Sequence, residues 1–340
     1  MKSNFIKTAA SAALSAALLA SVAFAAPANT IPLEGGENVE APAYEISVRN
    51  SAQPVRVVGK AVELGENSVT IEEETGADTT SKVIVNVAED TAIVDAVTGE
   101  ARSFADIQEN EALYAWVGPV MTRSLPPMTT GRVIVCNVPE DFSAPAYSEV
   151  QSVTKHDDGG VSLYVTGEMV LHLSADTDLS AYKTKNVVGL DELKPGDRIL
   201  SWYEMVMMSY PGQATPSKVV VFPYGYEGYV SADSLTVSVN GAELAVPGKA
   251  EENRLMVPVR ALAEALGCQV TWEAETNSVV VKQGEDTLYS FTIGGGDATR
   301  EGNMVVSLLA PTSAADGVTY MALEDLANLH DLKVAQGFSF

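Results

Sequence analysis

The chain has 340 residues with 45 acidic and 21 basic side chains, so its formal net charge at pH 7 is −24, and 46% of its residues are hydrophobic. That length and composition allow two or three domains with hydrophobic cores. A surface this acidic repels nucleic acid and anionic lipid, and neither is expected as a partner. The acids are scattered rather than clustered, which favours solubility outside the cell over a dedicated site for cations or basic partners.

The N-terminus has the pattern of an export signal. Lys2 and Lys7 precede an apolar run over residues 9–24, and residues 23–25 form an Ala-x-Ala cleavage site. The run is too short for a comfortable membrane span. We therefore expect a signal peptide over residues 1–25 that is removed, a secreted or cell-envelope-associated location, and no stable membrane span afterwards.

A linker is predicted over residues 26–53, because this segment is rich in Pro, Ala, Glu and Asn and lacks periodicity. Its segment Tyr44–Val48 is apolar enough to pair with the domain that follows.

Only two cysteines occur, Cys136 and Cys268, and they lie far apart in the sequence. A disulfide between them is an open alternative in an oxidising compartment. Two isolated cysteines are more often small buried apolar residues, which is the interpretation we favour.

The middle of the chain contains an internal repeat with an offset of 86 residues. The matched segments are Asp90-Thr91 with Asp176-Thr177, residues 104–116 with 190–202, and residues 132–135 with 218–221; one residue of slippage brings Ser124 and Pro126 over Ser209 and Pro211. Shared spacing over this length indicates duplication of one domain. We predict β repeats at 54–142 and 143–224.

Both copies read as short strands bounded by Gly, Asn and Asp. The predicted strands are Val55–Leu64, Val69–Glu73, Val83–Val87 and Arg132–Asn137 in the first copy, and Val161–Thr166, Val170–Leu173, Arg198–Tyr203 and Lys218–Phe222 in the second. Such even spacing is typical of a small barrel or sandwich, and the sequence does not decide between them.

The tryptophans Trp116 and Trp202 occupy matched positions in the two copies. They are either platforms on which a sugar stacks or core residues that hold each barrel closed. The second interpretation is favoured, because large aromatic side chains at equivalent positions are more often buried.

The C-terminal third contains one strand–helix–strand unit with clear start and stop signals. Pro258 suits a first helical turn and Gly267 a helix end, and between them apolar residues recur with helical spacing. Gln269–Trp272 and Val279–Val281 read as strands. The unit recurs weakly 64 residues later, with Ala322, Glu324 and Asp331 in place of Pro258, Arg260 and Gly267.

This unit, with Val239-Asn240-Gly241 ahead of it, resembles the copper amine oxidase N-terminal-like domain of secreted and surface-attached bacterial proteins. The resemblance implies a small α+β domain at 230–340 built from a doubled strand–helix unit, and it supplies no reaction. Arg260, near the helix start, is expected to cover apolar surface and to pair with a local carboxylate.

Catalytic chemistry is not indicated. The three histidines, His156, His172 and His330, form no H-x-H pair, so the three-histidine copper site of the amine oxidases is not expected. The templates of serine hydrolases, zinc proteases and nucleotide-binding loops are absent, and Asp157-Asp158 with two following glycines reads as a hairpin turn. We expect no enzyme and no cofactor.

One cluster has a chemical alternative. Met205, Met207 and Met208 fall within four residues, and in a strand Met205 and Met207 face the same side, as two thioethers for Cu(I) require. They are weak candidates for a metal site, because methionine is also adaptable core filler.

These observations favour a non-catalytic binding or structural protein at the cell surface, with a cell-envelope polymer or a surface protein as its partner. A polysaccharide-active enzyme with two carboxylates brought together by the β repeats, and a metal-binding protein using the methionine cluster, are the alternatives.

Overall fold

The computed structural model describes residues 53–74, 80–140, 144–183 and 188–335. Of this structure 51% is strand and 9% helix, with two α-helices. The prediction of a mostly β fold with a small α+β C-terminal domain is confirmed. The expected signal peptide, and the linker up to residue 52 with Tyr44–Val48, lie outside the described residues. No helix in the described ranges is long and apolar enough to cross a membrane.

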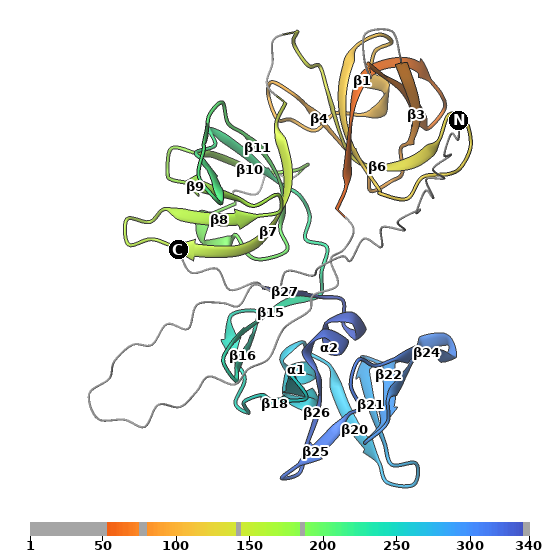
Figure 1. Ribbon diagram of the computed structural model, residues 1–340, viewed down its shortest axis with the longest axis vertical. Coiled ribbons are helices and arrows are strands. Elements are labelled where there is room, and N and C mark those ends of the chain that lie inside the picture. The colour runs from red at the N-terminus through yellow and green to blue at the C-terminus, as the bar shows by residue number, and fades with distance from the viewer. Residues whose placement is uncertain (1–52, 75–79, 141–143, 184–187, 336–340) are drawn as a thin grey trace, which may run out of the picture. The chain divides into compact units, whose positions relative to one another are not determined.

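The first β module is a closed ring of strands (Figure 1). Its elements are β1 (Val55–Leu64), β2 (Ser68–Glu74), β3 (Thr80–Asn86), β4 (Ala92–Asp95), the 3-10 turn η1 (Phe104–Asp106), β5 (Ala112–Val117) and β6 (Met128–Cys136). β1 pairs with β2 and β5, β2 with β3, and β5 with β6, and the ring closes because β6 also pairs with β3. A closed ring removes exposed sheet edges, so this module is a barrel rather than a sandwich.

The second β module pairs its strands in the same order. Its elements are β7 (Ala146–Lys155), β8 (Val161–Val165), β9 (Met169–Leu173), β10 (Asp178–Ala181), η2 (Leu190–Glu192), β11 (Arg198–Trp202), β12 (Val206–Met207), β13 (Gly212–Ala214) and β14 (Lys218–Val221). The place of β6 is taken by β13, which pairs with β9, and by β14, which pairs with β11. This agreement supports the predicted duplication, which stays a prediction.

Trp116 and Trp202 are buried, but not as predicted inside separate barrels. They belong to one hydrophobic cluster that contains residues of both modules, including Val94, Leu200 and Phe222. The Trp202 indole Nε1 donates to the carbonyl of Ala96 at 2.7 Å, from one module to the other. The expectation that each tryptophan closes its own barrel is therefore wrong, because strand faces outside the ring also carry apolar side chains.

The C-terminal domain consists of three small sheets and two helices. Its strands are β15 (Gly228–Asp233), β16 (Thr236–Val239), β17 (Ala242–Glu243), β18 (Lys249–Glu251), β19 (Arg254–Pro258), β20 (Gln269–Glu273), β21 (Ser278–Gln283), β22 (Asp286–Thr292), β23 (Asp297–Arg300), β24 (Met304–Ser307), β25 (Ser313–Ala315), β26 (Val318–Ala322) and β27 (Leu332–Val334), with η3 at Glu301–Asn303. β19 pairs with β26, and the helices α1 (Val259–Ala265) and α2 (Leu323–Leu329) follow these two strands directly.

The two strand–helix units form for the reasons that the sequence indicates. Pro258 lies at the N-cap of α1, and Gly267 beyond its end has a φ of +80°, which glycine adopts without strain. Asp331 takes the corresponding place after α2 with a φ of +53°. Leu262 and Leu326 are fully buried in the same core cluster, so the doubled unit packs its two helices around one core.

Candidate functional site

The histidines do not form a metal site. His156 and His172 both bond to the hydroxyl of Ser162, at 2.7 and 2.9 Å, and His172 Nε2 lies 2.9 Å from Gln213 Oε1. His330 Nε2 lies 2.8 Å from the hydroxyl of Tyr289 in the C-terminal core. No group of three or more His, Cys, Asp or Glu residues able to hold a metal ion occurs among the described residues.

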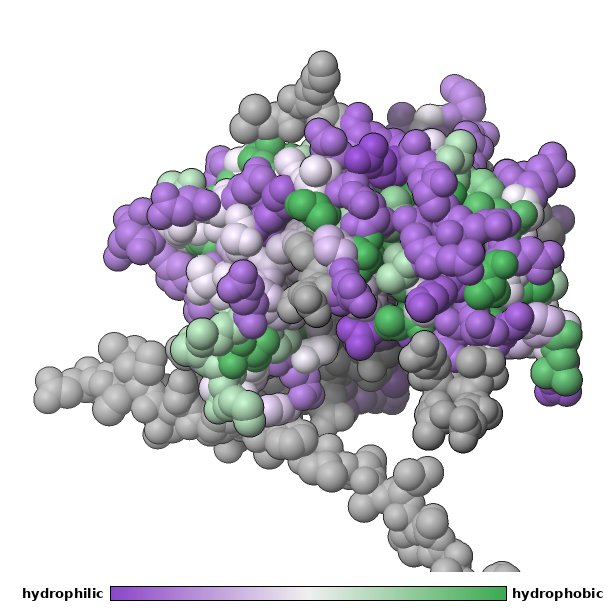
Figure 2. Space-filling view, turned by 90° about the horizontal axis from the view of Figure 1, so that it is seen from above, coloured by the Kyte–Doolittle hydropathy of each residue, from purple (hydrophilic) through white to green (hydrophobic). Residues whose placement is uncertain are grey.

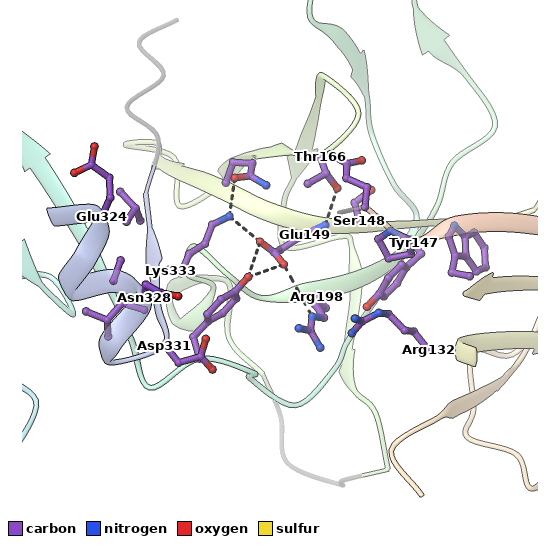
Figure 3. A pocket seen from close by; sticks show the side chains of 18 of the residues that line it. Arg132, Tyr147, Ser148, Glu149, Thr166, Arg198, Glu324, Asn328, Asp331 and Lys333 are labelled. Carbon is purple, nitrogen blue, oxygen red and sulfur yellow. Dashed lines mark hydrogen bonds and ion pairs between the residues drawn. The ribbon is translucent and has the colours of Figure 1, made fainter. Parts of the chain in front are cut away.

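A pocket of about 410 Å³ is lined by polar side chains from several elements (Figure 3). The residues that line it belong to one compact unit of the chain. Glu149 lies on β7, Arg198 on β11 and Lys333 on β27, while Tyr226 lies in the segment before β15. Glu149 and Lys333, which are 184 positions apart in the sequence, therefore meet in this pocket.

The centre of this pocket is the carboxylate of Glu149. It accepts hydrogen bonds from Lys333 Nζ at 2.7 Å and from the Tyr226 hydroxyl at 3.1 Å, and Arg198 Nε lies 4.0 Å away. Lys333 Nζ also donates to Gln151 Oε1 at 2.7 Å. The Lys333 side chain is only 8% exposed, so these partners replace the water that its ammonium group loses on burial.

The aromatic segment between the second module and the C-terminal domain is not a simple linker. Burial, together with the charge and the hydrogen bond of Glu149, raises the pKa of Tyr226 to about 12. The Tyr224 hydroxyl donates to the carbonyl of Pro195 at 2.9 Å, and the Lys194 ammonium lies 4.1 Å from the Tyr224 ring centroid. Tyr224 therefore holds this segment against Lys194 and Pro195, and Tyr226 holds it against β7.

A second part of the pocket carries two guanidinium groups, one of which, that of Arg198, also faces Glu149 at 4.0 Å. Arg132 and Arg198 lie beside Tyr147 (Figure 3), and Trp116 lines the same wall. Burial raises the pKa of Tyr147, and the charges of Arg198 and Arg132 act in the opposite direction. Arg132 is exposed and makes no hydrogen bond or ion pair with another described residue. Two guanidinium groups and a hydroxyl form a suitable site for an anionic group.

Two other acids of the pocket, Glu324 and Asp325, have structural partners, whereas Asp331 is exposed at its rim. Glu324 pairs with Arg254 at 3.0 Å, and Asp325 accepts from the backbone amide of Leu309 at 2.9 Å. Burial raises the pKa of Asp325, and backbone hydrogen bonds oppose that effect. A general acid and a general base need free access to a substrate. Glu324 and Asp325 are therefore engaged within the fold and are not free to act in this way.

The residues singled out from the sequence lie elsewhere. Arg260 Nη1 pairs with Glu264 at 3.2 Å and donates to the carbonyl of Val270 at 2.8 Å, which is the expected pairing with a local carboxylate. Cys136 and Cys268 are buried and free, as expected. The three clustered methionines are exposed, so the core-filler interpretation is wrong for them.

The residues of the pocket were not predicted. Arg132 is the first residue of a matched segment, and Tyr226 belongs to an aromatic run, so two weak signals were present in the sequence. Glu149 and Lys333 carry no such signal, because their pairing depends on how β7 and β27 are placed.

Comparison with known families identifies the C-terminal third. Residues 238–336 match the model of the copper amine oxidase N-terminal domain, as the sequence resemblance indicates. In the amine oxidases this N-terminal domain is non-catalytic. Comparison with curated proteins gave no significant match.

Proposed function

We propose that the protein is a secreted or cell-surface binding protein without catalytic activity, which holds an anionic group of a cell-envelope polymer or surface partner in the pocket between Arg132 and Glu149. The observation that carries the proposal is the pair of guanidinium groups, Arg132 and Arg198, beside the Tyr147 hydroxyl. Guanidinium groups bind carboxylates and phosphates in a planar, often bidentate geometry.

The two guanidinium groups of the pocket contrast with the strongly acidic character of the whole chain. With a net charge of −24 the protein repels polyanions over most of its surface. On the face shown in Figure 2, hydrophilic side chains cover most of the surface and hydrophobic ones form small separate groups. A local positive site then selects one anionic group at a defined place instead of adsorbing a polyanion at random.

A binding role also agrees with the state of the carboxylates. The alternative of a polysaccharide-active enzyme requires two carboxylates that flank a substrate bond. In this pocket Glu149 accepts from Lys333 and Tyr226, and Glu324 pairs with Arg254. These bonds hold the elements together, and they favour the binding interpretation over the enzyme.

The test is co-sedimentation of the full chain with purified cell-wall material. We expect retention that weakens as salt is raised. Arg132→Gln should reduce it at least about fivefold, since a charge-assisted contact contributes roughly 1 kcal/mol or more. Arg260→Gln is the matched control, because it removes the same charge from an exposed helix outside the pocket. No retention, or equal retention of Arg132→Gln and Arg260→Gln, would refute the proposed site.

Export is tested separately. The proposed signal peptide predicts a mature protein that begins at Ala26, which N-terminal sequencing of the protein from the culture medium or envelope fraction would reveal. An intact Met1 on a membrane-embedded protein is the opposite result.

A further inference from the structure

The second β module presents a methionine-rich loop, residues 204–211, to solvent. The exposed fractions of Met205, Met207 and Met208 are 78%, 53% and 103%. Methionine is normally among the buried residue types, and three exposed thioethers within four residues gain nothing from core packing. Their position therefore points to a role at the surface.

The loop has a defined internal structure. β12 and β13 pair Met207 with Gln213. The Ser209 amide donates to the carbonyl of Met207 at 2.9 Å, and the Ser209 hydroxyl donates to the carbonyl of Pro211 at 2.7 Å. Gln213 Nε2 in turn donates to Ser209 Oγ at 3.3 Å, and its other amide atom bonds to His172. These bonds fix the backbone from which Met205 and Met207 project.

Met205 and Met207 share one hollow. Both line a depression of about 540 Å³, and its polar lining residues include Tyr203, Glu204 and Gln213. No histidine or cysteine lines it. Thioether sulfur is a soft donor that favours Cu(I), whereas Zn(II), Cu(II) and Ca(II) favour imidazole, thiolate or several carboxylates.

The first module does not share this donor set. At the offset of 86 residues it has Pro119, Met121 and Thr122 in place of Met205, Met207 and Met208. Met121 is partly buried and packs against the core of its own barrel. The scaffold of the loop recurs, because Ser124 Oγ donates to the carbonyl of Pro126 at 2.8 Å. The two modules thus share the Ser-to-Pro hydrogen bond of this loop, and the second module differs from the first by its additional methionines.

We propose that Met205 and Met207, the two methionines that line this hollow, bind Cu(I). The binding is independent of the anion pocket, since neither thioether lines that pocket. The hollow is open to solvent, so the ion can be delivered by, or passed to, another soft ligand by exchange of thioethers without any change of its oxidation state.

The experiment is an anaerobic competition between the full chain and bicinchoninate for Cu(I), repeated by titration calorimetry with Ag(I) as a redox-inert soft cation. We expect one equivalent to bind. The double variant Met205→Leu/Met207→Leu should raise the dissociation constant by roughly tenfold or more, because it removes both sulfurs and keeps the apolar volume.

Met304→Leu is the matched control, because Met304 is a 60% exposed methionine on β24 of the C-terminal domain. It should leave the dissociation constant unchanged, and all variants should keep the melting temperature of the parent chain. Failure of the parent chain to take Cu(I) or Ag(I), or equal affinity in the double variant and in Met304→Leu, would overturn the proposal.

Discussion

The ion pair between Glu149 and Lys333 offers the sharpest test of how the second β module and β27 meet. The two charged atoms lie 2.7 Å apart, and the side chains are 16% and 8% exposed. Lys333→Met removes the ammonium group and keeps most of the apolar stem. The change therefore isolates the charge from the packing.

The expected cost follows from the surroundings that remain. Removing one partner of a buried ion pair destabilises proteins by roughly 3–5 kcal/mol. Here the Tyr226 hydroxyl and Arg198 still face the carboxylate, so the loss should fall at the lower end, about 3 kcal/mol. Glu149→Gln leaves the ammonium with Gln151 as its neutral partner and should cost a similar amount.

The assay is a double-mutant cycle in urea with the parent chain, Lys333→Met, Glu149→Gln and the double variant. We expect the double variant to lose less than the sum of the single losses, with a coupling free energy of at least about 1 kcal/mol. If the losses add to within about 0.5 kcal/mol, the two side chains do not interact, and the pocket around Glu149 is not formed as described.

Other predictions concern single positions. Leu262→Ala should destabilise the protein by roughly 2–5 kcal/mol, because it removes buried apolar surface and leaves a cavity. Arg260→Ala removes one partner of an exposed ion pair and should cost under about 1 kcal/mol. Thermal melts of the full chain compare the two variants, and a well-tolerated Leu262→Ala would contradict the packing. Burial, with the charge of Arg300, lowers the pKa of His330 from 6.5 to about 4. Between these two pH values His330 is protonated in the unfolded chain and neutral in the folded chain. Stability should be full above pH 6.5 and fall as the pH drops towards 4, and His330→Phe should flatten this slope in urea titrations; an unchanged slope would show that His330 is not responsible. Burial raises the pKa of Cys136 to about 12, so iodoacetamide should label it at neutral pH only after unfolding, and rapid labelling of the native chain would contradict its burial.

Local features were predictable because local chemistry decides them. The predicted strand Val55–Leu64 matches β1 at both ends, and the helix between Pro258 and Gly267 is α1. Both depend on alternation, helical spacing and end signals within about ten residues. Short strands such as β12 and β13 escaped prediction, since two or three residues give no measurable period.

Burial on the outer faces of the barrels was harder to predict. A sequence period identifies which residues share a face, but not whether another module covers that face. Trp116 and Trp202 show the consequence, since their burial was expected and the shared cluster that buries them was not. The exposed methionines show the reverse case, in which apolar residues in a strand-like segment meet solvent.

The second strand–helix unit of the C-terminal domain shows how a degenerate repeat acquires a new role. Arg260 and Glu324 occupy matched positions, yet the Arg260 side chain is 57% exposed and the Glu324 side chain 4% exposed. A buried carboxylate needs a cation or hydrogen-bond donors, and Arg254 on β19 pairs with Glu324 at 3.0 Å, which ties α2 to the strand before α1. The face of α2 that carries Glu324 also carries Asn328, and both line the pocket around Glu149. Two of the three replaced positions of the second unit, Glu324 and Asp331, therefore line the pocket, while the first unit keeps the regular start and stop signals that make it recognisable.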